Sequence, residues 1–149
     1  MIQTRTRRHV CFVTIIEGNI ATPLRERCEA RIFERLTANR VDVSLLAIND
    51  NRCSLAVDEF DLRGVRAALQ SLNVALRVRK RCARISVKPH DGEPLPALWA
   101  VIKAMSDANI GIVHLAESAG SLTLLVDERE AERAHSALVQ CTMTTPRAA

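Results

Sequence analysis

Histidine and cysteine are the side chains best suited to bind a metal or attack a substrate, and here both are scattered. The chain contains His9, His90, His114 and His135. None of these histidines has a partner at metal-ligand or catalytic-triad spacing. We therefore expect no metal, no cofactor and no nucleophilic catalysis, and we do not expect an enzyme.

The cysteines favour a reducing compartment. They number five and show no paired spacing: Cys11, Cys28, Cys53, Cys82 and Cys141. Four of them fall in apolar runs, where a reduced cysteine behaves as a small hydrophobic residue. Disulfides are rare in the cytoplasm, so this usage predicts a cytoplasmic protein. No stretch approaches the ~20 apolar residues that cross a bilayer, so we expect no membrane association.

Basic residues raise the possibility of a nucleic-acid partner. The net charge is +4, and the densest cluster consists of Arg77, Arg79, Lys80, Arg81 and Arg84. RNA-binding domains of βαββαβ type stack bases on aromatic side chains of their central strands. The corresponding strands here, 53–57 and 122–126, contain no aromatic residue. We therefore expect no nucleic-acid partner.

Two single residues each allow two interpretations. His114 lies in an apolar run and is either a pH-sensitive interface group or a partly buried, hydrogen-bonded filler. Trp99, the only tryptophan, either anchors an interface or packs in the core.

The sequence repeats itself after 69 residues. Residues 41–69 return as 110–138 without a gap, so that the run 55–59 (LAVDE) corresponds to 124–128 (LLVDE). This period exceeds the ~20–50 residues of solenoid and propeller repeats, which predicts that each copy is a small domain. Two copies of one domain without a catalytic cluster favour binding over chemistry.

The elements of the two copies follow one order, strand–helix–strand–strand–helix–strand. We predict strands at 10–16, 41–47, 53–57, 74–78, 83–87, 110–116, 122–126 and 139–143. Apolar stripes at 28–36, 62–69, 98–105 and 131–138 predict the helices. Asn39 and Arg40 are expected to end the first helix, and Asp58 and Asp127 to cap the second helix of each copy.

This order is typical of the ferredoxin-like fold. We predict an α+β protein with two βαββαβ domains in tandem, at 8–80 and 81–143, each an antiparallel sheet with helices on one face. Residues 1–7 and 144–149 are predicted to be flexible termini. Because each sheet leaves an edge strand uncovered, we expect a homodimer.

Several segments carry a family resemblance. Residues 108–112 (ANIGI), Ser118, 122–128 (LTLLVDE) and 137–138 resemble the second ACT domain of aspartokinases, and 82–87 (CARISV) resembles its opening strand. Residues 30–36 (ARIFERL) and 41–43 (VDV) are similar to the first ACT domain. The resemblance covers roughly residues 10–140 and includes nothing of the kinase catalytic domain. It implies a non-catalytic regulatory module that controls an enzyme of amino-acid biosynthesis or its own assembly.

The resemblance also implies an amino-acid effector, chiefly lysine or threonine, bound where ACT domains meet. The family places its ligand against the start of the first helix and the adjoining strand, where free N–H groups suit a carboxylate. The implied ligand-binding positions in this chain are Arg27, Cys28, Ser44, Asn49, Ala97, Val113 and Ser118.

The chain departs from the family at these positions. A Pro-Gly before the first helix is replaced by residues 26–27 (ER) and 95–96 (LP) in the two copies. Arg27 either binds a ligand carboxylate through two hydrogen bonds or lies on a solvated helix face. Ser44 and Asn49 either bind an amino group or lie at a strand and a turn, and Ser118 has the same two readings. The alternative function is a structural dimerisation module with degenerate ligand sites.

Overall fold

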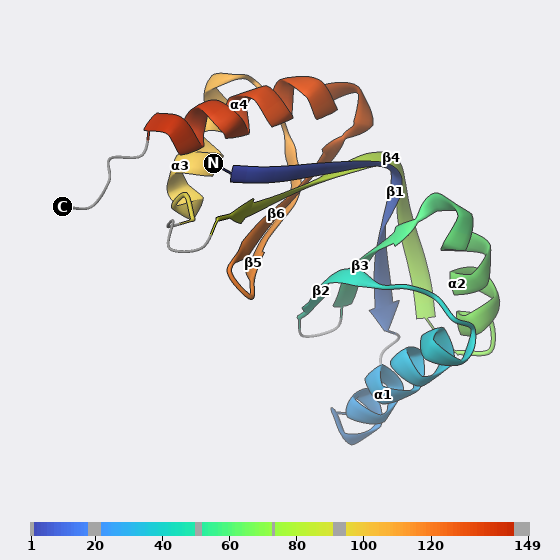
Figure 1. Cartoon of the computed structure of the whole chain (residues 1–149). Helices are drawn as coiled ribbons and strands as arrows, with labels where there is room; N and C mark the ends of the chain where they lie inside the picture. Colours follow the sequence, from blue (N-terminus) through green and yellow to red (C-terminus); the bar gives the residue numbers. More distant parts are fainter. Residues whose placement is uncertain (1, 18–21, 50–51, 73, 91–94, 145–149) are drawn as a thin grey trace. The chain divides into compact units, whose positions relative to one another are not determined.

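A computed structural model describes residues 2–17, 22–49, 52–72, 74–90 and 95–144. Figure 1 shows strands interspersed with helices along the chain. The strands are β1 (Ile2–Glu17), β2 (Ser44–Ile48), β3 (Arg52–Asp58), β4 (Val74–Pro89), β5 (Ile112–Ser118) and β6 (Ser121–Asp127). The helices are α1 (Thr22–Ala38), α2 (Leu62–Leu69), α3 (Leu98–Asp107) and α4 (Ala131–Thr144), with short 3-10 turns before α2 and α4. Among these described residues, no helix is long and apolar enough to cross a membrane.

The chain forms two compact units. The first unit comprises residues 9–81, and the second comprises residues 1–8 together with 82–149. The strand order is β2-β3-β1-β4-β6-β5, so that β1 and β4 each contribute to both units. The boundaries fall at His9 and Arg81, which share a left-handed backbone with φ of 57° and 56°. The α+β class, with antiparallel strands and helices in each unit, is confirmed.

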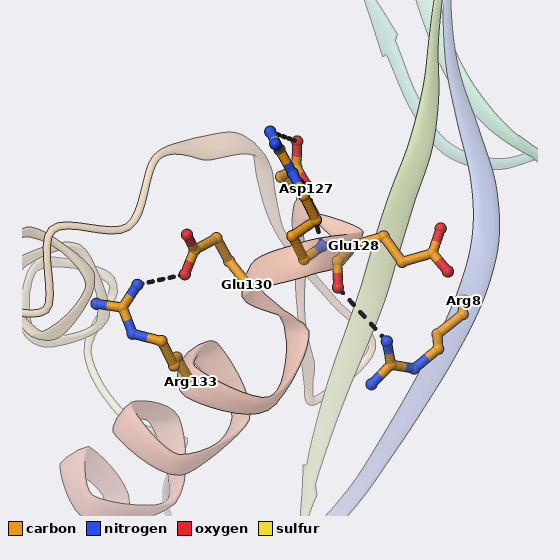
Figure 2. Close-up of polar contacts among 6 residues, drawn as sticks. Arg8, Asp127, Glu128, Glu130 and Arg133 are labelled. Carbon is orange, nitrogen blue, oxygen red and sulfur yellow. Dashed lines mark hydrogen bonds and ion pairs between the residues drawn. The ribbon is translucent and has the colours of Figure 1, made fainter.

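The prediction that residues 1–7 are a flexible terminus is wrong. Residues 2–8 form the first part of β1 and belong to the second unit. The predicted second domain, 81–143, does not include them. The Thr4 hydroxyl shares a hydrogen bond with Nε2 of His135 at 2.7 Å. Arg8 donates to the carbonyl of Glu128 at 3.5 Å (Figure 2) and lies 3.8 Å from the carboxylate of Glu132. These contacts hold the first residues of the chain against α4.

The predicted strand at 139–143 is also wrong. These residues continue α4, which ends at Thr144, so this residue is not part of a flexible terminus; residues 145–149 lie outside the described part of the chain. The start of β1 is placed beside β4, where we expected a strand from the end of the chain. The strands predicted at 74–78 and 83–87 are joined in β4.

The ends of α1 and α3 have the same backbone conformation at positions 69 residues apart. The N–H of Val41 donates to the carbonyl of Leu36, and the N–H of Ile110 donates to that of Met105, at 3.0 and 2.9 Å. The residues just before, Arg40 and Asn109, have φ of 55° and 56°. Both helices therefore end in the motif that satisfies the last carbonyls through one left-handed residue. The predicted helix end at Asn39 and Arg40 is confirmed.

Each unit has its own apolar core between its sheet and its two helices. The first core is built around Val13, Ile15, Ile32, Leu36, Leu55 and Val65. The second core is built around Ile85, Val87, Val101, Met105, Leu124 and Leu138. Figure 1 shows α1 beside α2 in one unit and α3 beside α4 in the other. The helices cover one face of the sheet but not its edge strands. A ligand or a partner can therefore approach the backbone along an edge strand.

Candidate functional site

Four of the predicted ligand-binding residues lie on the edge strands of the two units. Ser44 begins β2 and Asn49 directly follows it. Val113 and Ser118 lie 69 residues later, in β5. β2 and β5 occupy the two ends of the strand order. Among the described residues, β2 and β5 therefore each have a neighbouring strand on one side only, which makes their outer sides possible places for a ligand or a partner strand.

Both edge strands have an irregularity near their starts, and the two irregularities overlap without coinciding under the 69-residue offset. The pairing of β2 with β3 shifts between Ser44 and Ala47, and that of β5 with β6 shifts between Ile112 and His114. Leu45, inside the first of these bulges, has a positive φ of 53°. Val113 lies inside the second. Bulges of this kind re-aim side chains and end regular pairing, and they are frequent next to binding sites.

The polar groups of β2 do not converge on one point. The hydroxyl of the half-buried Ser44 donates to the carbonyl of Ala56 at 3.4 Å. The backbone N–H of the exposed Asn49 donates to the carbonyl of Arg52 at 2.8 Å. Five strand steps separate Ser44 from Asn49, which corresponds to about 16 Å along an extended chain. One small ligand within the first unit can therefore contact either residue but not both. The side chain of Ser118 lies outside the described part.

The two helix starts differ from each other. We expected Arg27 and Cys28 at the start of the first helix, which is wrong because α1 begins at Thr22 and contains both residues beyond its first turn. Their side chains lie outside the described part of the structure. In the second unit, Ala97 directly precedes α3 with φ −62° and ψ 142°, and no side chain caps the helix. Only the second unit therefore presents a predicted residue, Ala97, at a helix start.

The start of α4 has its charged groups already engaged (Figure 2). The carboxylate of Asp127 accepts from the backbone N–H of Arg129 at 2.9 Å, which confirms it as a cap, whereas Asp58 makes no such bond. The same carboxylate raises the pKa of the Arg129 guanidinium through a hydrogen bond. Arg133 pairs with Glu130. The charged residues before and at the start of α4 therefore cap and stabilise this part of the chain.

His114 lies beside the bulge of β5 and is half-buried. Burial disfavours its charged form and lowers the pKa of the imidazole below its usual 6.5. The described residues contain no group of three or more histidine, cysteine, aspartate or glutamate side chains that could hold a metal ion. Four of the cysteines, Cys11, Cys53, Cys82 and Cys141, are buried free thiols.

A groove between α3 and α4 was missed by the sequence analysis. It encloses about 580 Å³ and is lined by Ala97, Trp99, Ala100, Lys103, Ala104, Asp107, Ala108, Ala137, Gln140 and Cys141. We call it the α3/α4 groove. Trp99 is 71% exposed, so it does not pack in the core. The signal for this groove is present in the sequence as alanines at 97, 100, 104 and 108, at helical spacing beside the only tryptophan.

No family model matches the sequence, and no curated protein matches it. Solved structures match the fold along nearly the whole chain. A putative C-terminal regulatory domain of aspartate kinase from Porphyromonas gingivalis W83 is 14% identical, with a TM-score of 0.78 and coverage of 97% of this chain and 99% of that one. The ligand-free regulatory subunit of aspartate kinase from Thermus thermophilus is 15% identical, with a TM-score of 0.72 and coverage of 93% and 95%.

The same fold is found within longer enzymes. Escherichia coli aspartokinase III in complex with aspartate and ADP is 17% identical, with a TM-score of 0.75; the match covers 93% of this chain but 32% of that one. At these identities the likeness concerns the fold.

Proposed function

We propose that this protein is a non-catalytic regulatory module, which binds a small amino acid at the edge strands of its units and thereby controls a partner enzyme or its own assembly. The observation that carries the proposal is the fold. The two units of this chain match a putative C-terminal regulatory domain of aspartate kinase over almost the full length of both chains. The shared fold does not identify a ligand, so the choice of lysine or threonine follows from the resemblance of the sequence. A partner from amino-acid biosynthesis follows from it as well.

The chemistry of the edge strands suits an amino acid. Backbone carbonyl groups on the outer side of an edge strand can accept hydrogen bonds from an ammonium group, which is a donor only. Within the second unit, the start of α3 beside Ala97 has no side-chain cap, so its first N–H groups can donate to a carboxylate. Asn49 can offer its side-chain amide as donor and acceptor.

A homodimer would complete such a site. Leu46 and Ile48 lie on β2, and each is 49% exposed. Apolar side chains on an uncovered edge strand favour pairing with a second copy. We propose that two copies associate through the exposed apolar side chains of β2 and that the amino acid binds beside this contact. The free thiols favour a cytoplasmic location.

The test is calorimetric titration of the purified protein with lysine and with threonine, followed by a thermal-shift screen of the other amino acids. Binding of one of them supports the proposal. Asn49→Ala should weaken that binding about fivefold, because a neutral side-chain hydrogen bond contributes about 1 kcal/mol. Gln70→Ala, exposed after α2, serves as the matched control. A complete lack of heat and of thermal shift with every amino acid would count against a sensor.

The second candidate function is a structural dimerisation module without a ligand. It is favoured by the hydroxyl of Ser44, which is directed to the carbonyl of Ala56 within its own unit. Sedimentation velocity without any amino acid distinguishes the two. A structural module is a dimer at all times, and Ile48→Lys should separate it into monomers. A sensor should change its sedimentation coefficient when the amino acid is added.

A further inference from the structure

We propose that the α3/α4 groove is a second binding site, separate from the edge strands, for a planar aromatic molecule that carries a carboxylate. The ring would lie between Trp99 and the alanine residues of the groove, and the carboxylate would pair with Lys103. The inference does not rest on the proposed regulatory function, although Ala97 both lines this groove and precedes the helix start that the regulatory proposal gives to a carboxylate.

The first unit shows that the groove is not imposed by the fold. The residues 69 positions earlier than Ala100 and Ala104 are Arg31 and Arg35. The guanidinium of Arg35 donates to the hydroxyl of Ser71, which lies at the position equivalent to Gln140. The Arg35 side chain therefore crosses from α1 to the residues after α2. In the second unit Ala104 occupies the equivalent position, and its short side chain leaves the surface between α3 and α4 open.

The lining of the groove suits a flat ring. Alanine side chains from both helices, at 97, 100, 104, 108 and 137, present only methyl groups. Trp99 adds an aromatic face at one side, and it is 71% exposed. Offset stacking of two aromatic rings is favourable beyond the apolar area that it buries. The volume of about 580 Å³ lies within the range of small-molecule sites, about 300–1,000 Å³.

The charges of the groove favour an anionic group on that ring. Lys103 pairs with Asp107 at 2.6 Å, and both side chains are about two-thirds exposed. A surface pair of this kind is weak, so a ligand carboxylate can replace Asp107 at little cost. Arg133 donates to the carbonyl of Ala108 and pairs with Glu130, so Lys103 is the cation of the groove lining that a carboxylate can reach. Asp107 is the lining group that would repel an anion.

The chain contains one tryptophan and no tyrosine, so its intrinsic fluorescence reports on the groove. The probe is 4-nitrobenzoate, a flat carboxylate that quenches indole emission. We expect saturable quenching, with a single dissociation constant that calorimetry reproduces. Ala104→Arg, which places the residue of the first unit into the groove, should weaken binding at least tenfold. Ser106→Arg, on the same helix but outside the groove, should leave binding unchanged.

The contribution of charge is measured separately. Lys103→Gln should weaken 4-nitrobenzoate about two- to fivefold, as expected for one exposed ion pair. Uncharged nitrobenzene should bind more weakly than the acid and should not respond to this substitution. Ala100→Arg serves as a second blocking variant, since the first unit carries Arg31 at that position of its helix.

Three outcomes would overturn the proposal. Quenching that rises linearly without saturation would show that the probe only collides with an exposed ring. Equal binding by the Ala104→Arg and Ser106→Arg variants would place the probe elsewhere on the surface. Equal or tighter binding of 4-nitrobenzylammonium would assign the groove to a cation held by Asp107 instead of a carboxylate held by Lys103.

Discussion

The helix layers of the two units share one backbone plan and differ in what lies between their helices. In the first unit, Arg35 reaches from α1 to Ser71 beyond the end of α2. In the second, Ala104 and Gln140 stand at these positions and line an open groove. The helix ends that flank both places keep the same hydrogen bonds. The outer surface between two helices can therefore change its chemistry without a change in the fold.

The cores of the two units differ in a complementary way. The inner face of α2 carries Leu62 and Val65, whereas alanines at 131 and 134 occupy the equivalent places on α4. In the facing sheet the sizes are reversed, because Cys53 of the first unit corresponds to Leu122 of the second. Cores tolerate such exchanges when the total volume is kept. Each core is thus fitted to its own unit.

The largest expected effect comes from removing the segment that the second unit takes from the start of the chain. Deletion of residues 2–8 removes a strand next to β4 and the contacts of Thr4 and Arg8 with α4. The loss of unfolding free energy should exceed the about 2–5 kcal/mol of a single core truncation. Hydrogen exchange should show amides of 82–87 losing protection before those of 53–57. Gln3→Ala, exposed on the same segment, is the control.

An exchange of core residues tests whether the two cores are individually fitted. Val65→Ala and Ala134→Val each install the residue of the other unit at a fully buried position. The first leaves a void and the second overfills its core, so each should lower the unfolding free energy by about 1–3 kcal/mol. Urea denaturation measures both. If either variant is as stable as the parent, the two cores are interchangeable and the complementary sizes have no energetic meaning.

A substitution at a helix end should have a smaller effect, and it should raise the unfolding free energy instead of lowering it. Arg40 and Asn109 both have a positive φ, which costs arginine more than asparagine. Arg40→Gly should therefore raise the unfolding free energy by up to about 1 kcal/mol, and Asn109→Gly should change it less. Thermal unfolding of the two variants side by side decides the matter. A larger gain at 109 than at 40 would contradict this account of the two caps.

The smallest effect concerns pH and is confined to the second unit, because Leu45 occupies the position equivalent to His114. The pKa of His114 is lowered on folding, so the unfolded chain binds more protons on this group around and below its ordinary value of 6.5. The unfolding free energy should therefore fall as the pH drops through 6.5. His114→Leu should flatten that fall, as measured by urea denaturation between pH 7.5 and 5.5.

Much of the fold could be predicted from local sequence patterns. The repeat period, the alternating apolar runs and the helix end at Arg40 could be predicted from the sequence because neighbouring residues determine them. The early start of α1 also has a local signal that we did not use. Pro23 follows Thr22, and proline is favoured in the first turn of a helix.

Long-range pairing could not be predicted in the same way. The first eight residues are polar and basic, typical of a tail, and only their contacts with α4 and their place beside β4 make them a strand. Residues 139–143 alternate between apolar and polar side chains, which favoured a strand although the same residues continue α4. The α3/α4 groove depends on two helices packing side by side, which the alanine spacing alone does not reveal. The predicted ligand residues on β2 and β5 stay a prediction.

The contact between Thr4 and His135 has a consequence for how the protein is made. A ribosome releases residues 9–81 while α4 is still unsynthesised, so the first unit has every residue it needs early. The second unit must wait for the last turns of α4, and meanwhile Thr4 and Arg8 lack their contacts with residues 128–135. Translation at about 5–20 residues per second makes this delay several seconds. During that interval a chaperone or a fused tag that occupies the first eight residues would compete directly with native assembly.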